Sequence, residues 1–173
     1  DYLIKNIKAM ANNATKQGRS QLNILSAACS KGHEAYSLAM HLHSLLEKEG
    51  ISLKIHITGF DIDHECIQYA KNGVYTANEL QHVPNHLLAR YWVRGTKEIS
   101  NFYKIKNELQ DLCEFRHGNL LKINDALMDQ KFDVIFCRNA LIYFNEDQIQ
   151  HIVKSLTHHV SPNGILVTGL SES

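Results

Sequence analysis

The hydrophobic pattern of the chain alternates between short apolar runs and stripes with a helical period. Five runs have the length and composition of buried strands, at residues 22–25, 53–60, 115–121, 132–137 and 165–169. Apolar side chains three and four positions apart predict helices over residues 2–16, 34–47, 64–72 and 146–156. Pro and Gly in residues 161–164 predict a turn before the last strand. Because strands and helices alternate, we expect an α/β domain with a mostly parallel sheet, flanked by helices and joined by right-handed crossovers.

The middle of the chain has a different character. Residues 90–94, 102–106 and 112–116 are short, aromatic and roughly alternating, which predicts a small antiparallel sheet inserted into the main fold. Residues 74–88, before it, are predicted to be a loop with a short helix around Pro84. Three interpretations of the small sheet stay open: contact with nucleic acid, pairing of its edge with a peptide, or a flap that only packs.

Small residues connect the first predicted strand to the helix that follows it. Between positions 26 and 32 they let a ligand approach the backbone closely, at the carboxyl end of a strand, where α/β sheets bind their ligands. The turn has only Gly32 rather than the three glycines of a dinucleotide fingerprint, and no Gly-Lys-Ser/Thr follows it as in a P-loop. The pattern therefore predicts a ligand site that does not depend on phosphate.

Acidic residues follow the first two strands. Glu34 opens the first helix after the sheet begins, where an acid either complements the helix dipole or accepts hydrogen bonds from a cationic or hydroxylated ligand. Asp61 and Asp63 follow the second strand. A carboxylate there accepts two hydrogen bonds from a vicinal diol such as that of ribose, so we assign Asp61 to the ligand. Asp63 is assigned to capping the next helix.

Polar residues also follow the clearest buried strand of the chain, residues 132–137. Arg138 and Asn139 come directly after it, and Tyr143 lies a few positions further on. An Arg-Asn pair has no structural role after such an apolar strand. Since the carboxyl ends of parallel strands share one edge, we expect these side chains on the same rim as Glu34 and Asp61.

Composition narrows the function classes. The chain has 173 residues, enough for one domain, and 18 basic and 18 acidic residues, a balance that argues against a nucleic-acid partner. Four scattered cysteines without CxxC spacing fit reduced thiols in a cytoplasmic protein. Eleven histidines form no HExxH pair, so no metal is expected. No apolar run is long enough for membrane insertion, and no signal peptide is visible.

Seven segments together form a more specific pattern: residues 26–39, 61–63, 90–91, 118–121, 136–139, 142–144 and 169–172. In this order, over nearly the whole chain, they resemble the C-terminal domain of the chemotaxis receptor methyltransferases, the CheR family. Members use S-adenosylmethionine (SAM) to methylate glutamate side chains and release S-adenosylhomocysteine. The resemblance implies a Rossmann-like class I SAM-dependent methyltransferase fold with a small antiparallel β-subdomain.

The resemblance also implies a set of cofactor-binding residues. Glu34 and the backbone near Ala28 would meet the methionine end of the cofactor, and Asp61 would hold its ribose. Asn119 and Leu120 would contact the adenine side.

The remaining implied roles concern catalysis. Arg138 and Asn139 would line the cleft between cofactor and substrate, and Tyr143 would lie near the transferring methyl. A glutamate carboxylate is ionised at neutral pH and attacks the methyl without a general base, so catalysis would rest on positioning and electrostatics. The guanidinium of Arg138 matches the geometry of such a carboxylate.

The resemblance sets expectations for domains and partners. Residues 1–20 would be a linker helix after a missing helical N-terminal domain, and residues 21–173 the SAM-binding domain, with the β-subdomain at about 90–117. The partners would be the cytoplasmic domains of chemoreceptors, with a receptor peptide on the β-subdomain as in some members. This piece alone would be a poor enzyme. Two alternatives remain: a non-catalytic module that binds SAM or a partner, and a methyltransferase of the same fold with another substrate.

Overall fold

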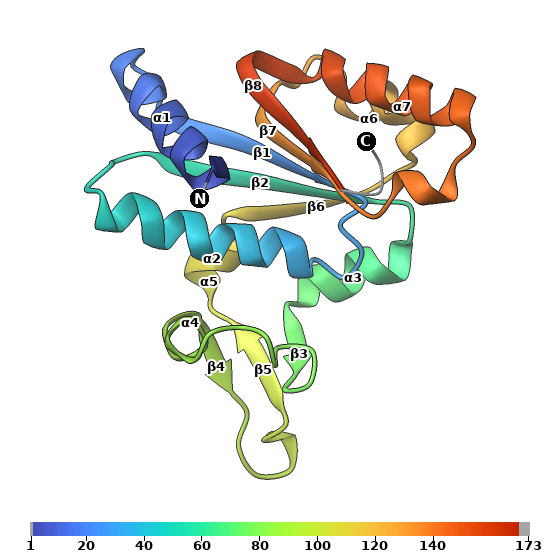
Figure 1. Cartoon of the computed structure of the whole chain (residues 1–173). Coiled ribbons are helices and arrows are strands. Elements are labelled where there is room, and N and C mark those ends of the chain that lie inside the picture. The colour runs from blue at the N-terminus through green and yellow to red at the C-terminus, as the bar shows by residue number, and fades with distance from the viewer. Residues whose placement is uncertain (1, 170–173) are drawn as a thin grey trace.

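The computed structural model describes residues 2–169, with side chains from residue 5 onward. Five parallel strands form its central sheet: β1 (Gln21–Ala27), β2 (Lys54–Asp61), β6 (Cys113–His117), β7 (Phe132–Cys137) and β8 (Val160–Thr168). They lie in the order β6-β2-β1-β7-β8 (Figure 1). This arrangement confirms the predicted parallel α/β sheet. The strand order reverses between β1 and β7, which is where open α/β sheets bind ligands.

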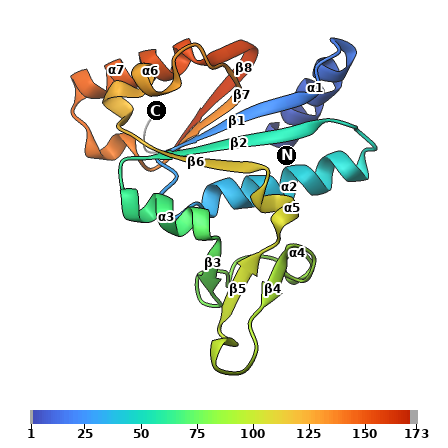
Figure 2. The same cartoon turned by 180° about the vertical axis from the view of Figure 1, so that it is seen from behind.

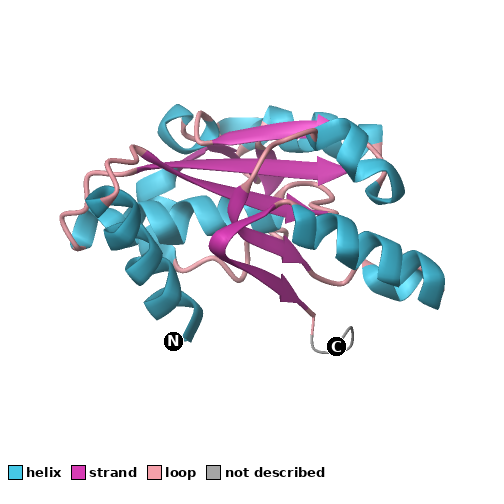
Figure 3. Cartoon of the chain, turned by 90° about the horizontal axis from the view of Figure 1, so that it is seen from above, coloured by secondary structure: helices cyan, strands magenta, loops and turns pink. Residues whose placement is uncertain are grey.

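Helices cover both faces of this sheet. One face packs against α1 (Tyr2–Lys16), α2 (His33–Lys48) and α3 (His64–Asn72), and the other against α6 (Ile123–Leu127) and α7 (Glu146–His158). Figures 1 and 2 show α2 and α3 on one side of the strands and α6 and α7 on the other. Figure 3 shows the twist of the strands between these helices. The helices α1 and α3 have the predicted bounds, and α2 and α7 are slightly longer than predicted.

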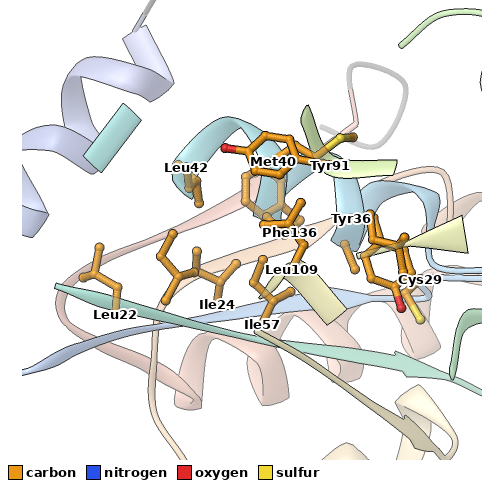
Figure 4. Packing of buried hydrophobic residues seen from close by; sticks show 14 of the residues in the cluster. Leu22, Ile24, Cys29, Tyr36, Met40, Leu42, Ile57, Tyr91, Leu109 and Phe136 are labelled. Atoms are coloured by element: carbon orange, nitrogen blue, oxygen red, sulfur yellow. The ribbon is translucent and has the colours of Figure 1, made fainter. Parts of the chain in front are cut away.

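Each face of the sheet carries its own apolar cluster, because successive side chains of a strand point to opposite faces. Leu22 and Ile24 of β1 belong to the cluster that contains α2, whereas Leu25 belongs to the cluster that contains α6 and α7. Figure 4 shows Leu22 and Ile24 beneath Met40 and Leu42 of α2. Burying a side chain of this size contributes roughly 1.5–3 kcal/mol. Packing from both sides therefore holds the strand, and with it the loop at its end, in place.

Local sequence signals set the starts of two helices. Asp63 Oδ1 accepts hydrogen bonds from the backbone N–H of Glu65 at 2.8 Å and of Cys66 at 3.1 Å, which confirms its predicted role as the cap of α3. Asn145 and Gln148 form a reciprocal capping box at the start of α7. These caps end the loops that leave β2 and β7, so they help to define the edge where the candidate site lies.

A second, antiparallel sheet projects from the main body on the side of α2 and α3 (Figures 1 and 2). Its strands are β3 (Val74–Thr76), β4 (Trp92–Arg94) and β5 (Phe102–Ile105), in the order β3-β5-β4. The helix α4 (Asn85–Tyr91) leads into β4, and the short helix η1 (Lys97–Ile99) joins β4 to β5. The predicted small antiparallel sheet is thus confirmed.

Two details of that prediction are wrong. Residues 74–76, predicted as loop, form β3 because the fully buried Tyr75 anchors them in the core. Residues 112–116, predicted as part of the small sheet, lie largely in β6, which pairs in parallel with β2. The intervening helix α5 (Asn107–Gln110) buries Leu109 and returns the chain to the main sheet. A short alternating run does not by itself identify its partner strand.

The last strand differs from its prediction as well. Residues 161–164, predicted as a turn, lie within β8 as an irregularity: Phe132 pairs with Val160, but Val134 pairs with Ile165. The chain bulges there and continues as one strand. Residues 170–172, part of the last segment on which the family resemblance rests, lie outside the described residues. Among residues 2–169 no helix is both long and apolar enough to cross a membrane.

Candidate active site

A cleft of about 520 Å³ opens at the carboxyl ends of β1, β2, β6 and β7. Seven of the eight residues singled out from the sequence line it: Ala28, Asp61, Asn119, Leu120, Arg138, Asn139 and Tyr143. The eighth, Glu34, is not part of the lining. A volume of this size lies within the range of pockets for small molecules and cofactors, roughly 300–1,000 Å³. The prediction that Arg138, Asn139 and Tyr143 share one rim with Asp61 and Glu34 is therefore confirmed except for Glu34, while the roles of all eight residues stay predictions.

The loop after β1, residues 28–32, forms one wall of the cleft and has an unusual backbone. Ala28, Ser30 and Gly32 all have positive φ angles, of 59°, 48° and 84°. A non-glycine residue in this region costs free energy and needs contacts that hold it. Gly32 is also crowded, because a Cβ there would lie 2.8 Å from the Ala70 Cβ. This loop, which we call the β1–α2 loop, therefore depends on the neighbours that fix it.

Asp61 is one of these neighbours. Its Oδ2 accepts a hydrogen bond of 2.7 Å from the backbone N–H of Ser30, and its Oδ1 accepts one of 2.9 Å from that of Asp63. A carboxylate has about four acceptor positions, so both oxygens keep capacity for a ligand. The side chain is thus held at the cleft with acceptor positions left over, which suits two hydroxyls of a diol.

Glu34 lies behind the cleft wall, in the first turn of α2. Its Oε1 accepts a 2.7 Å hydrogen bond from the Ser26 hydroxyl, and its Oε2 lies 3.9 Å from Nη1 of Arg138. Burial raises the pKa of Glu34 above its ordinary value, while the Ser26 hydrogen bond and the charge of Arg138 oppose this shift. Arg138 lines the cleft, so Glu34 is connected to it through this ion pair.

Ser26 was not singled out from the sequence. Its side chain is fully buried in β1 and orients Glu34. The available signal was a hydroxyl residue within an apolar strand, since a buried polar group needs a hydrogen-bond partner.

The loop after β7 carries the other polar residues. Asn139 has a φ of 57°, a left-handed conformation that turns the chain sharply at the end of the strand. The side chain of Arg138 is 54% exposed, and Tyr143, at the end of the short helix η3 (Leu141–Tyr143), is 81% exposed. Leu141 is buried and holds η3 against the core. The geometry thus presents a cation and a phenol at the open side of the cleft.

The remaining wall comes from the loop after β6. Asn119 Oδ1 accepts a 2.9 Å hydrogen bond from the backbone N–H of Leu121 and so caps the short helix η2 (Leu120–Lys122). Leu120 is mostly buried. Across the cleft, Ile62 is 62% exposed between two aspartates, and Phe144 completes the apolar lining. Apolar residues of this kind suit the flat face of a nucleobase.

Sequence reasoning missed five lining residues: Ser30, Ile62, Leu121, Ala140 and Phe144. All of them lie within three positions of a predicted site residue, so the signal was proximity rather than residue type. No group of three His, Cys, Asp or Glu side chains between residues 2 and 169 is arranged to hold a metal ion. The cleft instead offers the carboxylate of Asp61, backbone groups and apolar walls, with Glu34 connected to it through Arg138, a set that fits a nucleoside bearing a cationic amino acid.

Comparisons with known proteins agree with this interpretation of the cleft. The family described as "CheR methyltransferase, SAM binding domain" matches residues 1–173. The chain is similar to the "Chemotaxis protein methyltransferase" of Escherichia coli (strain K12), at 34% identity over 88% of this chain and 52% of that protein. It is also similar to "Chemotaxis protein methyltransferase 2" of Pseudomonas aeruginosa, at 34% identity over 91% of this chain and 55% of that protein. The chain therefore spans about half the length of the curated relatives it matches.

Among solved structures, the one titled "DhpI-SAM-HEP complex" is similar with a TM-score of 0.49 and 17% identity. That match covers 94% of this chain and 54% of the solved one.

Proposed function

Because the chain belongs to the CheR methyltransferase family and matches the SAM-binding domain of that family, we propose that the protein methylates glutamate side chains of chemotaxis receptors. The observation that carries the proposal is the cleft itself: the tips of three parallel strands, β2, β6 and β7, bring Asp61, Asn119, Arg138 and Tyr143 to one cavity. The names of the relatives, chemotaxis protein methyltransferases, support the receptor as substrate. The reaction would take place in the cytoplasm.

The cofactor would lie along the tips of β1, β2 and β6. Asp61 would accept hydrogen bonds from the two ribose hydroxyls, in addition to the two backbone N–H groups it already holds. Glu34 would attract the ammonium of the methionine end, with the β1–α2 loop near Ala28 beside it. Leu120 and Asn119 would contact the adenine. Asp61, Asn119 and Leu120 line the cleft, and Glu34 is connected to it through its ion pair with Arg138. These positions, and the negative charges of Asp61 and Glu34, support the assignments.

The substrate would enter from the open side, where Arg138, Asn139 and Tyr143 lie. SAM supplies a methyl group already activated by a sulfonium. A glutamate oxygen would form the new C–O bond while the methyl–sulfur bond breaks, and the electron pair of that bond stays on sulfur. No proton moves, so the protein's task is to hold the acceptor in line. Arg138 would orient the carboxylate by its charge, and Tyr143 would orient it by its hydroxyl.

We also propose that the small sheet binds a receptor peptide. Its order β3-β5-β4 makes β4 an edge strand, and an extended peptide can add to such an edge through backbone hydrogen bonds. Val93 in the middle of β4 is 55% exposed and offers an apolar contact. Arg94 beside it would attract an acidic peptide. Binding of an acidic receptor-tail peptide to the protein, lost with Val93→Asp, would support this part of the proposal, and unchanged binding would oppose it.

Transfer of tritiated methyl groups from SAM by the parent protein to membranes that contain chemoreceptors tests the main proposal. A methyl ester releases volatile methanol in alkali, whereas a methylated amine does not. We expect base-labile label on the receptor and none when its acceptor glutamates are changed to glutamine. Base-stable label, or label on nucleic acid, would identify a methyltransferase with another substrate. Binding of SAM without any transfer would identify a non-catalytic module.

A further inference from the structure

A hydrogen bond joins the small sheet to the β1–α2 loop. The hydroxyl of Tyr75, in the centre of β3, donates to the backbone carbonyl of Lys31 at 2.5 Å. Tyr75 is fully buried, and its ring packs against those of Tyr36, Tyr69 and Trp92. The acceptor is a carbonyl of the loop that forms one wall of the cleft, 44 positions away along the chain. A buried side chain of the small sheet is thus hydrogen-bonded to the β1–α2 loop of the main sheet.

A second contact joins the same two parts. Glu79, in the turn after β3, accepts hydrogen bonds from the backbone N–H and the hydroxyl of Thr76, at 2.9 and 2.8 Å, and from the hydroxyl of Tyr69. This carboxylate lies 3.8 Å from Nζ of Lys31, which in turn lies 4.7 Å over the ring of Tyr69. Both the backbone and the side chain of Lys31 are therefore held by residues of the small sheet and its following turn.

The loop needs such contacts because its backbone is strained. Ala28 and Ser30 have positive φ angles, a conformation that costs on the order of 1–3 kcal/mol per residue unless neighbours impose it. On the side of the main sheet, Asp61 holds the N–H of Ser30. On the opposite side, Tyr75 holds the carbonyl of Lys31. The loop is therefore clamped between the proposed ribose acceptor and the small sheet.

We propose that Tyr75 and Glu79 are positioning residues that set the affinity of the cleft for its cofactor by fixing Lys31 and, through it, the N–H of Ser30 against Asp61. Neither side chain lines the cleft. They act through the loop, so that the small sheet contributes to cofactor binding as well as to any partner contact. The inference rests on the proposed function, because the ligand of the loop is the cofactor assigned there.

Tyr36 provides a matched control. It lies in the same aromatic cluster, is almost fully buried, and its hydroxyl also donates to a backbone carbonyl, that of Ala70 at 2.9 Å. That acceptor belongs to α3 and not to the β1–α2 loop. Tyr36→Phe and Tyr75→Phe each delete one buried hydroxyl and its hydrogen bond. A purely structural role for Tyr75 predicts the same consequences from both.

The experiment measures S-adenosylhomocysteine binding by titration calorimetry for the purified protein and both variants, together with their melting temperatures. We expect Tyr75→Phe to raise Kd about five- to tenfold, because the net contribution of the hydrogen bond that preorganises the β1–α2 loop must then be made up on binding. Tyr36→Phe should change Kd less than about twofold, although both variants lose a similar hydrogen bond. In methyl transfer, Tyr75→Phe should raise KM for SAM and leave kcat and the KM for receptor unchanged. Equal effects of the two variants on Kd, or no effect of Tyr75→Phe, would overturn the proposal.

Glu79→Gln decides the question if Tyr75→Phe does not fold. It keeps an oxygen acceptor for Thr76 but removes the charge that faces Lys31. A threefold or larger rise in Kd supports the proposal, and an unchanged Kd overturns it. Asp61→Ala in the same series separates an error in the cofactor site from an error in the role of Tyr75 and Glu79. If Asp61→Ala leaves Kd unchanged, the cofactor site itself is wrongly assigned. If only Asp61→Ala weakens binding, the site stands and the role of Tyr75 and Glu79 is rejected.

Discussion

The backbone N–H of Ser30 donates a 2.7 Å hydrogen bond to Oδ2 of Asp61, which joins the loop after β1 to the tip of β2. These residues lie 31 positions apart, one in the loop after β1 and the other at the end of β2, the neighbouring parallel strand. The bond fixes both the left-handed backbone of the loop and the direction of the carboxylate. A ligand that uses Asp61 therefore meets a wall already in position, and ordering it on binding costs little.

Asp61→Ala should weaken binding of S-adenosylhomocysteine by about tenfold or more, because hydrogen bonds to a charged acceptor are worth roughly 1.5–3 kcal/mol. Asp63→Ala is the matched control, since this aspartate caps α3 and does not line the cleft. It should lower stability by about 1 kcal/mol with unchanged affinity. Titration calorimetry and urea unfolding of both variants measure the two effects. Unchanged affinity in Asp61→Ala would reject the assignment.

Cofactor affinity should fall on mild acidification. Burial raises the pKa of Glu34 above its ordinary value of 4.5. An ammonium binds the ionised carboxylate, so binding weakens as the pH drops through this raised pKa, about tenfold per pH unit below it. The same shift means that the folded protein binds the proton of Glu34 more tightly than the unfolded chain does. The contribution of Glu34 to folding stability is therefore greatest at low pH and is lost as the pH rises through the raised pKa.

The Glu34→Gln variant isolates this effect. It should bind S-adenosylhomocysteine weakly, and its affinity should no longer fall as the pH drops. Calorimetric titrations at several pH values above and below that pKa provide the measurement. A decline that persists unchanged in Glu34→Gln would mean that another group carries the pH dependence.

Tyr143→Phe should lower kcat for methyl transfer by roughly ten- to a hundredfold, as the loss of a group that orients the reacting atoms does. The side chain is 81% exposed, so the melting temperature should not change measurably. KM for SAM should also stay the same. Steady-state kinetics with receptor membranes test this. A normal kcat would remove Tyr143 from the catalytic residues.

Gly32→Ala should destabilise the fold by about 1–3 kcal/mol and weaken cofactor binding, because Gly32 combines a φ of 84° with a Cβ position 2.8 Å from the Ala70 Cβ. Gly50→Ala is the control. It also has a positive φ, of 64°, but has open space around its Cβ position. It should cost only about 1 kcal/mol and leave cofactor affinity unchanged. Similar losses of affinity in both variants would contradict the role of the close approach at Gly32.

Asp133→Ala should destabilise the protein by about 1.5–3 kcal/mol, the range for losing hydrogen bonds to a charged acceptor. The buried carboxylate accepts hydrogen bonds from both Nη atoms of Arg19 at 2.7 Å and from the N–H of Asn23 at 2.9 Å. Its loss removes the acceptor of the Asn23 N–H and of Nη1 of Arg19, while Nη2 keeps the carbonyl of Gln21. The more exposed pair of Glu114 and Arg116 gives the control, since Glu114→Ala should cost less than about 1 kcal/mol. Equal unfolding midpoints in urea would contradict the difference.

The parallel sheet and most of the cleft could be predicted because their signals are local. A buried strand is a continuous apolar run, and the polar residues just after it, such as Asp61 and Arg138, must lie at the carboxyl edge of the sheet. Asp63 could be assigned to a cap because capping depends on the next three residues.

Pairings between distant residues could not be predicted. The bond from Tyr75 to Lys31 spans 44 positions and that from Arg19 to Asp133 spans 114, so neither leaves a periodic signal. The prediction that residues 112–116 belong to the small sheet is wrong for a similar reason: their alternation fits either sheet, and only the tertiary pairing with β2 decides. Glu34 lies behind the cleft because Ser26, in an apolar strand, orients it.

The central claim is that the cleft at the ends of β1, β2, β6 and β7 holds the cofactor. A crystal structure of the protein grown with S-adenosylhomocysteine tests it most directly. We expect the nucleoside in this cleft, with its ribose hydroxyls at hydrogen-bond distance from Asp61, about 2.5–3.0 Å. A nucleoside bound elsewhere, or one in the cleft whose ribose does not touch Asp61, would contradict the claim.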